Sequence, residues 1–256
     1  MTDLIPRTVI VTGGARRIGR ALAESLARAG WTVVVHFHGS AGDADGVLDV
    51  IRSAGGRAVA LSADLGDADA TNGLMDRAVA IVGPVGVLIN NASIFERDDV
   101  GSVTPSSWSS HIDINLRAPL FLSQSFAAQL PSNARGAIVN ILDERVWNLT
   151  PHFLSYTVSK AGLWTLTQTL ALALAPRIRV NAVGPGPTLP SPRQSQAQFD
   201  EQAGSMPLGH GTTPGEIADA VAYILSARAM TGQMIALDGG QHLGWGQVPS
   251  HAPPGD

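Results

Sequence analysis

The chain has 256 residues, of which 45% are hydrophobic and 15% are charged, so a sizeable apolar core is expected and intrinsic disorder is excluded. A net charge of −4 without a basic cluster argues against a nucleic-acid partner, and the absence of cysteine excludes disulfides, thiol nucleophiles and cysteine-based metal sites. No apolar stretch has membrane-spanning length and no signal-peptide pattern precedes the first apolar run, so we expect a soluble, cytoplasmic protein.

Short β-branched runs alternate along the chain with longer segments of helical period. Strands are expected at Thr8–Val11, Thr32–Phe37, Arg57–Leu61, Val85–Asn90, Ala137–Leu142, Ile178–Ala182 and Gln233–Leu237. Helices are expected at Ile18–Ala29, Asp43–Ala54, Asp67–Val82, Pro105–Leu130, Tyr156–Ala175 and Pro214–Ser226. This order predicts an α/β fold of the Rossmann type, a doubly wound parallel sheet of about seven strands with helices on both faces.

The alternation is not divided by any linker rich in Pro, Gly or Ser, so we expect residues 1–243 to form one domain. Within it, residues 184–213 contain five prolines and show little helical period, which predicts a long substrate loop. Residues 244–256 are expected to form a C-terminal tail.

A glycine-rich turn joins the first strand to the first helix in the sequence T-V-I-V-T-G-G-A-R-R-I-G. Gly13, Gly14 and Gly19 permit a tight turn, and the helix that follows offers free N–H groups to a pyrophosphate. The simpler alternative is an ordinary strand-to-helix turn. We favour a dinucleotide site because the turn lies at the first strand–helix junction of a parallel sheet.

The end of the second strand carries no acidic residue, although NAD-specific enzymes place one there for the ribose hydroxyls. Arg16, His38 and Ser40 could instead receive a 2′-phosphate, which favours NADP(H). His36 and His38 alternate on a strand end, and without a third ligand they do not predict a metal site. Asp64 could accept from the adenine amine or cap the next turn.

Only one lysine is present, because 16 of the 17 basic residues are arginine, and this Lys160 lies four residues after Tyr156. That spacing places both side chains on one face of a helix. A neighbouring ammonium stabilises the phenolate, so we expect Lys160 to lower the pKa of Tyr156 and make it a proton donor at neutral pH. A compact ammonium can also bind ribose hydroxyls, a role that arginine does not fill easily.

Together these motifs resemble the short-chain dehydrogenases/reductases over nearly the whole chain, up to about residue 243. The resemblance is carried by the glycine turn, N-N-A at Asn90–Ala92, Asn115, Y-x-x-x-K, Pro185–Gly186 and D-G-G at Asp238–Gly240. It implies a proton relay of Asn115, Tyr156 and Lys160, and assembly into a homotetramer. The candidate cofactor-binding residues are Gly13, Arg16, Arg17, Ile18, Gly19, His36, His38, Ser40, Asp64, Leu65, Asn91, Ala92, Tyr156, Lys160, Pro185, Gly186 and Thr188.

Three features of the sequence depart from the general family pattern. Asp143 stands thirteen residues before Tyr156, where a serine usually donates to a substrate carbonyl. An ionised carboxylate is an acceptor and opposes the negative charge that grows on a carbonyl oxygen, so a C=N substrate with N–H donors fits better. Arg17 replaces a glycine of the turn, and Ser93 and Phe95 follow the asparagines.

These departures, with H-F-H after the second strand, resemble the pteridine reductases of the same family. The resemblance implies that Phe95 stacks a pterin against nicotinamide, that Arg17 and Ser93 bind pterin or phosphate, and that Asp143 holds the amino-pyrimidine edge or takes part in protonation. Gly39 departs from that branch, where an arginine often binds the 2′-phosphate. Singly, Phe95 could be a buried loop anchor, Arg17 a surface arginine and Asp143 a strand-end cap.

The leading hypothesis is therefore an NADPH-dependent reductase of a small dihydropterin or dihydrofolate-like heterocycle. The alternative is a carbonyl reductase or alcohol dehydrogenase of the same fold with a non-pterin substrate. A third hypothesis is a nucleotide-sensing protein that has lost its chemistry, against which the intact Asn115, Tyr156 and Lys160 set argues.

Overall fold

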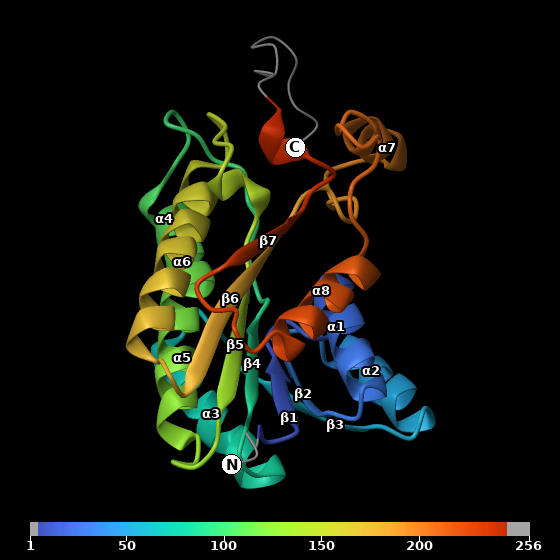
Figure 1. The fold of residues 1–256 in the computed structure, drawn as a ribbon. Coiled ribbons are helices and arrows are strands. Elements are labelled where there is room, and N and C mark those ends of the chain that lie inside the picture. The colour runs from blue at the N-terminus through green and yellow to red at the C-terminus, as the bar shows by residue number, and fades with distance from the viewer. Residues whose placement is uncertain (1–4, 245–256) are drawn as a thin grey trace.

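A computed structural model describes residues 5–244, which contain one seven-stranded sheet (Figure 1). Its strands are β1 (Thr8–Val11), β2 (Thr32–Phe37), β3 (Arg57–Ser62), β4 (Val87–Asn90), β5 (Gly136–Ile141), β6 (Ile178–Pro185) and β7 (Met234–Leu237). All neighbouring strands are parallel, in the order β3-β2-β1-β4-β5-β6-β7. The predicted Rossmann-type α/β fold is confirmed.

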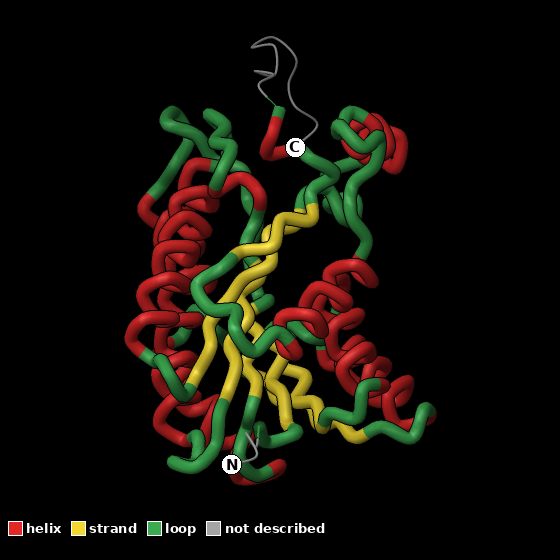
Figure 2. Tube along the Cα trace, in the orientation of Figure 1, coloured by secondary structure: helices red, strands yellow, loops and turns green. Residues whose placement is uncertain are grey.

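Helices cover both faces of the sheet (Figures 1 and 2). One layer contains α1 (Arg17–Arg28), α2 (Ala41–Ser53) and α8 (Pro214–Ser226), and the other contains α3 (Ala68–Val82), α4 (Pro105–Ile112), α5 (Ala118–Gln129) and α6 (Leu154–Ala173). A further helix, α7 (Gln196–Gly204), lies beyond the carboxyl end of the sheet. The two layers bury both faces of the strands, which explains why the strands are almost continuously apolar.

Alternate strand residues supply two apolar cores. Val9 and Val11 of β1 pack with Leu22 on the side of α1, whereas Ile10 packs with Phe126 on the side of α5. All five side chains are fully buried. Because strand side chains alternate between the faces, one short strand anchors both helix layers and fixes where its carboxyl end emerges.

The strand order reverses beside β1, which pairs with both β2 and β4. In open parallel sheets the ligand crevice lies at such a switch point, outside the carboxyl ends of the strands. Thr12 follows β1 there and donates its backbone N–H to Ile89 of β4 at 3.0 Å. Its hydroxyl accepts the backbone N–H groups of Asn91 and Ala92 at 2.9 and 3.0 Å. The glycine turn and the N-N-A segment are thereby joined.

The prediction of one continuous α-helix over Pro105–Leu130 is wrong. A π-helical turn, η1 (Asp113–Arg117), separates α4 from α5. Pro119 has no N–H with which to bond the carbonyl of Asn115, so the regular ladder cannot continue through this point. The wider turn contains the buried side chain of Asn115.

The structure of residues 184–213 differs in two respects from the predicted substrate loop. β6 continues to Pro185, past the expected start at Gly184, and the loop contains α7. The side chains of Ser195 and Gln198 form a capping box at the start of α7, a signal that the neighbouring prolines obscured. Two short 3₁₀ segments were also not predicted, η2 (Glu144–Val146) and η3 (Gln241–Leu243).

The predicted tail, residues 244–256, lies outside the described residues except for Gly244. Across residues 5–244 none of the helices has the length and apolar character needed to cross a membrane.

Candidate active site

The turn after β1 requires glycine at two of its predicted positions. Gly13 has a φ of 62°, and a Cβ on Gly19 would lie 2.0 Å from the carbonyl oxygen of Gly13. Asn91 holds the turn from β4 by donating its side-chain amide to Thr12 O at 2.8 Å and Gly13 O at 3.2 Å. α1 then begins after Arg16 without a side-chain cap, which leaves its first N–H groups available to an anionic ligand.

His36 supports this turn from within the protein. Its Nδ1 accepts the N–H of Gly13 at 3.1 Å, and its Nε2 lies 3.1 Å from the carbonyl of Ala63. Burial lowers the pKa of His36 to about 4, although the Ala63 hydrogen bond opposes the change. The ring is therefore neutral and both nitrogens are used, so His36 positions the glycine turn.

A cleft of about 280 Å³ opens beside the turn at the ends of β1 to β4. Its lining residues are Gly13, Ala15, Arg16, His36, Phe37, His38, Ser40, Asp64, Leu65, Ala92, Ser93, Ile94 and Ile114. Arg16, His38 and Ser40, predicted from distant motifs to bind a phosphate, are thus brought together. Leu65 is buried and supplies an apolar wall, and Ile18 packs against the core behind the turn.

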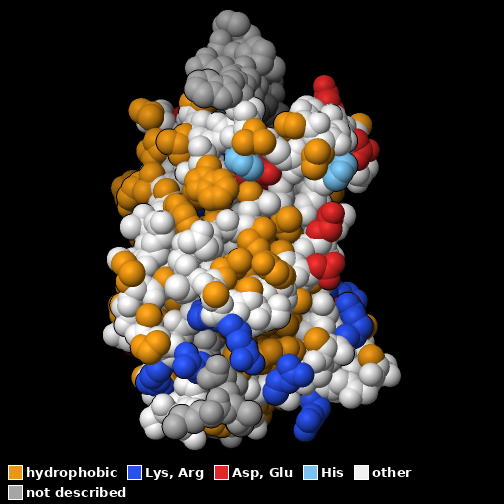
Figure 3. All heavy atoms as spheres, in the orientation of Figure 1, with side chains coloured by type: hydrophobic (Ala, Val, Ile, Leu, Met, Phe, Trp, Pro, Cys, Tyr) orange, Lys and Arg blue, Asp and Glu red, His pale blue; other side chains and the backbone are white. Residues whose placement is uncertain are grey.

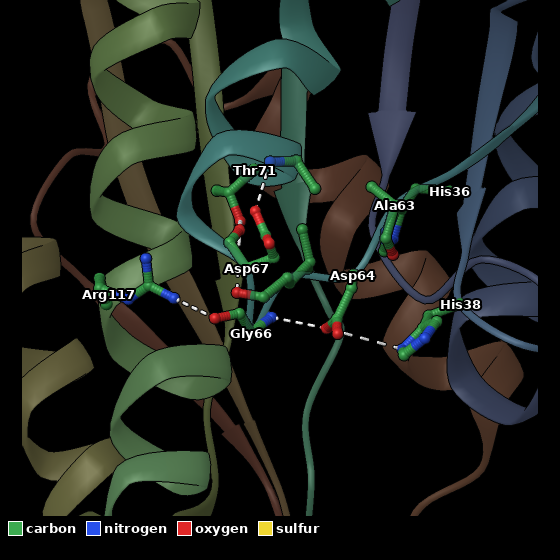
Figure 4. Close-up of polar contacts among 10 residues, drawn as sticks. His36, His38, Ala63, Asp64, Gly66, Asp67, Thr71 and Arg117 are labelled. Carbon is green, nitrogen blue, oxygen red and sulfur yellow. Dashed lines mark hydrogen bonds and ion pairs between the residues drawn. The ribbon is translucent and has the colours of Figure 1, made fainter.

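Two carboxylates face basic side chains of this cleft. Arg16 forms an ion pair with Asp43, and His38 Nδ1 lies 3.7 Å from Asp64 Oδ1 (Figure 4). Asp64 Oδ1 also accepts the N–H of Gly66 at 2.8 Å, so it caps the turn after β3. Capping this turn is one of the two roles predicted for Asp64. Arg117 donates to the carbonyl of Gly66 at 2.6 Å and holds the same turn from η1.

Tyr156 and Asp143 meet at the carboxyl end of β5. Tyr156 lies in the first turns of α6 and donates its phenolic O–H to Asp143 Oδ2 at 2.8 Å, while Asp143 Oδ1 accepts the backbone N–H of Arg145. Lys160 donates to the carbonyl of Ile141 at 2.8 Å, and its Nζ lies 5.7 Å from the centre of the Tyr156 ring. The three side chains predicted from spacing therefore form one cluster.

The expectation that Lys160 lowers the pKa of Tyr156 is wrong for the protein alone. Burial and then the Asp143 carboxylate raise the pKa of Tyr156 well above its usual value. Burial lowers the pKa of Lys160 from 10.5 to about 8, although Asp143 opposes the change. The phenol is consequently a neutral donor at physiological pH, whereas the lowered pKa of Lys160 lies close to neutrality.

Asn115 binds a different part of the site from the other predicted relay residues. Its Oδ1 accepts the N–H of Ile94 at 2.9 Å, and its Nδ2 donates to Ile94 O at 3.0 Å and to Ser159 Oγ at 3.1 Å. Asn115 thus fastens the segment that follows β4 to α6. Its side-chain groups are used in these contacts, none of which is with Lys160.

Phe95 lies beside the phenol of Tyr156. The two ring centres are 4.7 Å apart and the rings meet edge to face. One face of Phe95 stacks on Phe153, with centres 4.4 Å apart and an interplanar angle of 5°. Phe153 is fully buried and has the left-handed φ of 58°, uncommon for a bulky residue. The stack gives the site a flat aromatic wall.

A buried network holds this wall to the start of α6. Asp98 accepts the backbone N–H of Ser155 on Oδ1 and the hydroxyls of Ser155 and Ser107 on Oδ2, and its carbonyl accepts the N–H of Leu154. His111 contacts Ser155 Oγ through Nδ1 and accepts the N–H of Glu96 through Nε2. Asp98 therefore caps α6, since Phe153 at the N-cap position offers no polar side chain.

The predicted substrate loop, residues 184–213, contacts the candidate site through two arginines. Arg17, with a φ of 51°, donates to the carbonyls of Pro190 at 2.8 Å and Leu189 at 3.1 Å. Arg193 forms an ion pair with Glu96 at 2.7 Å and donates to the carbonyl of Phe95. The glycine turn and the Phe95 segment are thus both tied to the same loop.

The P-G segment after β6 lies against the D-G-G segment after β7. A Cβ on Gly186 would lie 2.7 Å from Asp238 Cα, and Gly186 donates its N–H to Leu237 O at 3.0 Å. Thr188 Oγ1 donates to Gly186 O at 2.9 Å. Pro185 is buried at the end of β6, so these predicted cofactor residues pack at the carboxyl ends of β6 and β7, and they are not among the residues that line the cleft beside the glycine turn.

Comparison with known proteins then places the chain in a family. A family model described as enoyl-(acyl carrier protein) reductase matches residues 13–242. The chain belongs to the short-chain dehydrogenase/reductase family. An uncharacterized oxidoreductase of Methylorubrum extorquens is 35% identical over 248 residues, covering 94% of this chain and 99% of the relative.

Two proteins of solved structure are more similar in sequence to this short-chain dehydrogenase/reductase than the Methylorubrum extorquens relative is. FolM alternative dihydrofolate reductase 1 from Brucella suis, in complex with NADP, superimposes with a TM-score of 0.91 at 45% identity, covering 98% of this chain and all of that chain. The corresponding protein from Brucella canis, also complexed with NADP, gives a TM-score of 0.90 at 43% identity, covering 97% and 100%.

Three further residues of this short-chain dehydrogenase/reductase could not be predicted from the sequence. Phe153 and Asp98 shape the aromatic wall, and Glu144 is a buried acid directly after Asp143. Burial raises the pKa of Glu144 to about 8, and its Oε2 has no hydrogen-bond partner. The one available signal was position, since Phe153 and Glu144 lie within three residues of Tyr156 and Asp143 in the sequence.

Proposed function

We propose that this protein is an NADPH-dependent reductase of pterin-like C=N heterocycles, of the dihydropterin or dihydrofolate class. The observation that carries the proposal is the hydrogen bond from Tyr156 to Asp143. Reduction of a carbonyl needs donors around its oxygen, and a carboxylate is an acceptor. A heterocycle with ring N–H groups gives Asp143 a donor to bind.

The cofactor proposed is NADP(H). The closely packed Gly13 and Gly19 fit a pyrophosphate approaching the start of α1. Arg16, His38 and Ser40 line the cleft where a 2′-phosphate would lie. When bound, NADPH supplies a hydride. The NADP present in both Brucella structures supports this choice.

The protein residues supply the proton. Reduction of C=N places a hydride on carbon and a proton on nitrogen, which gives CH–NH. Tyr156 is neutral and holds a transferable proton, whereas the Asp143 carboxylate, which accepts the Tyr156 hydroxyl in the protein alone, accepts from the substrate's N–H groups. Lys160, charged below about pH 8, stabilises the phenolate that Tyr156 leaves behind.

The aromatic wall favours a flat substrate. One face of Phe95 is occupied by Phe153, so a planar ring would stack on the other, next to the Tyr156 phenol. The names of the two Brucella relatives, alternative dihydrofolate reductases, support a substrate of this shape.

We also propose a homotetramer for this chain. Exposed apolar side chains include Trp108 of α4 at 39% and Val158 and Leu172 of α6 at 43% and 82%. Figure 3 shows apolar side chains gathered over the same helix layer. Light scattering after size exclusion tests the proposal, and a monomer at micromolar concentration would contradict it.

The test of function is a substrate panel. NADPH consumption is followed with dihydrobiopterin, dihydromonapterin and dihydrofolate, and with an equal number of ketones and quinones. We expect turnover of at least one reduced pterin and weak turnover of the ketones. Efficient reduction of ketones without any pterin would favour the carbonyl reductase alternative.

A further inference from the structure

The guanidinium of Arg145 lies over the aromatic wall. Its Cζ is 4.8 Å from the ring centre of Phe153 and 5.7 Å from that of Phe95. Arg145 is the third residue of the segment that begins at Asp143, so it reaches the wall from the same 3₁₀ turn that presents the carboxylate. Its positive charge is also felt at Tyr156, where it opposes the rise in the pKa of the phenol.

This guanidinium has no polar partner within the described part of the chain. Its Nε is buried without a hydrogen bond, and neither Asp143 nor Glu144 forms an ion pair with it. A buried donor without a partner is costly, and guanidinium groups near carboxylates usually pair with them. Arg193, which also lies 5.7 Å from the Phe95 ring, is in contrast committed to Glu96. Arg145 therefore has donors to offer a ligand.

Asp143 and Arg145 present complementary groups two residues apart. Asp143 accepts hydrogen bonds, whereas a guanidinium is only a donor. A ring lying on Phe95 beside Tyr156 would meet both groups at its edge. An N–H next to a C=O, the lactam edge of a 4-oxopyrimidine, offers the donor and the acceptor that this pair requires. A 2,4-diaminopyrimidine edge has no carbonyl for Arg145.

We infer that Arg145 is a substrate-binding residue that donates to the ring carbonyl of a lactam, and that the site selects 2-amino-4-oxo heterocycles over their 2,4-diamino analogues. The inference rests on the proposed function and specifies its substrate class. Arg145 does not transfer a proton; it orients the ring so that the reducible C=N bond lies beside the Tyr156 phenol.

The test measures binding, which does not depend on turnover. Pterin and 2,4-diaminopteridine are titrated into the wild-type protein with NADP+, and into Arg145→Met, which keeps an apolar side chain over the rings. We expect the variant to bind pterin on the order of ten- to a hundredfold more weakly and the diamino compound unchanged. Arg145→Lys should recover part of the pterin affinity. Arg57→Met, at an exposed site on β3, is the matched control.

Other outcomes overturn the inference. Equal losses for both compounds, or none, would show that Arg145 only packs against Phe153. If Arg145→Met raises the KM for dihydrofolate alone and not for dihydrobiopterin, the residue binds the tail carboxylates and not the lactam. If the wild-type protein binds neither pteridine, the proposed function fails together with the inference. If the protein reduces pterins but Arg145→Met keeps the wild-type ratio of affinities for pterin and 2,4-diaminopteridine, the inference alone is refuted.

Discussion

Tyr156 donates its phenolic hydrogen to Asp143 across 2.8 Å, so the proposed general acid of the site is bound to an acceptor before any substrate arrives. Both groups are fixed by backbone structure, Tyr156 by the first turns of α6 and Asp143 by the N–H of Arg145. A pair built in this way can offer a substrate one donor and one acceptor together. It suits a ring with N–H groups better than an isolated carbonyl.

The pH dependence of activity should follow Lys160. Because burial lowers the pKa of Lys160 to about 8, its charge is present below that pH and is lost above it. We expect kcat/KM to fall roughly tenfold for each pH unit above about 8. Initial rates between pH 6 and 10 would show this limb, and a profile that stays level to pH 10 would contradict it.

Replacing Lys160 by Arg should impair turnover of every substrate. The position is buried, and the planar guanidinium does not fit the place of an ammonium that donates to Ile141 O. We expect kcat to fall about a hundredfold, as for the loss of an acid–base group. Circular dichroism of the variant controls for folding, and full activity would show that the single lysine has no special role.

Glu144 should make the protein less stable as the pH rises. Its pKa is raised from 4.5 to about 8, so the folded protein keeps a proton that the unfolded chain releases. Stability is therefore lost between about pH 4.5 and 8, by up to ~1.4 kcal/mol per pH unit. In Glu144→Gln this slope should largely disappear from denaturant unfolding curves, whereas Glu201→Gln, at an exposed position, should retain it.

Removing the external cap of α6 should destabilise the protein. Hydrogen bonds from Ser155 and Ser107 lower the pKa of Asp98 even though burial favours the neutral form. Asp98→Ala leaves the backbone N–H and the hydroxyl of Ser155 buried without this acceptor, at a cost of ~1–3 kcal/mol, whereas Ser107 keeps the carbonyl of Thr104 as an acceptor. Urea unfolding measures the loss, with Asp49→Ala on the exposed side of α2 as control. Equal midpoints for the two variants would mean that Asp98 does not cap the helix.

Periodicity in the sequence was sufficient to predict the fold, because each strand is an apolar run and each helix has an amphipathic or apolar face. It failed where a local feature opposed the pattern. Pro119 divides one expected helix through the missing bond to Asn115, and the prolines around α7 concealed its Ser195 cap. Such breaks depend on single hydrogen bonds, which a window of hydrophobicity does not detect.

The candidate site was predictable where spacing alone brings residues together. Tyr156 and Lys160 share a helix, and Asp143 follows two residues after the end of β5. The roles of Phe153, Asp98 and Arg145 depend on how the segment after β4 packs on α6, a contact between residues up to 57 positions apart. The raised pKa of Tyr156 was likewise unpredictable, because burial and not the nearby ammonium determines it.

The most direct test of the account is the substrate preference of Asp143→Ser. A serine hydroxyl can donate to a carbonyl oxygen, whereas it binds N–H groups less strongly than a carboxylate does. We predict that kcat/KM for the best reduced pterin falls at least about a hundredfold while ketone reduction is unchanged or improved. An unaltered ratio of pterin to ketone turnover would contradict the assignment of Asp143 as the residue that selects the substrate.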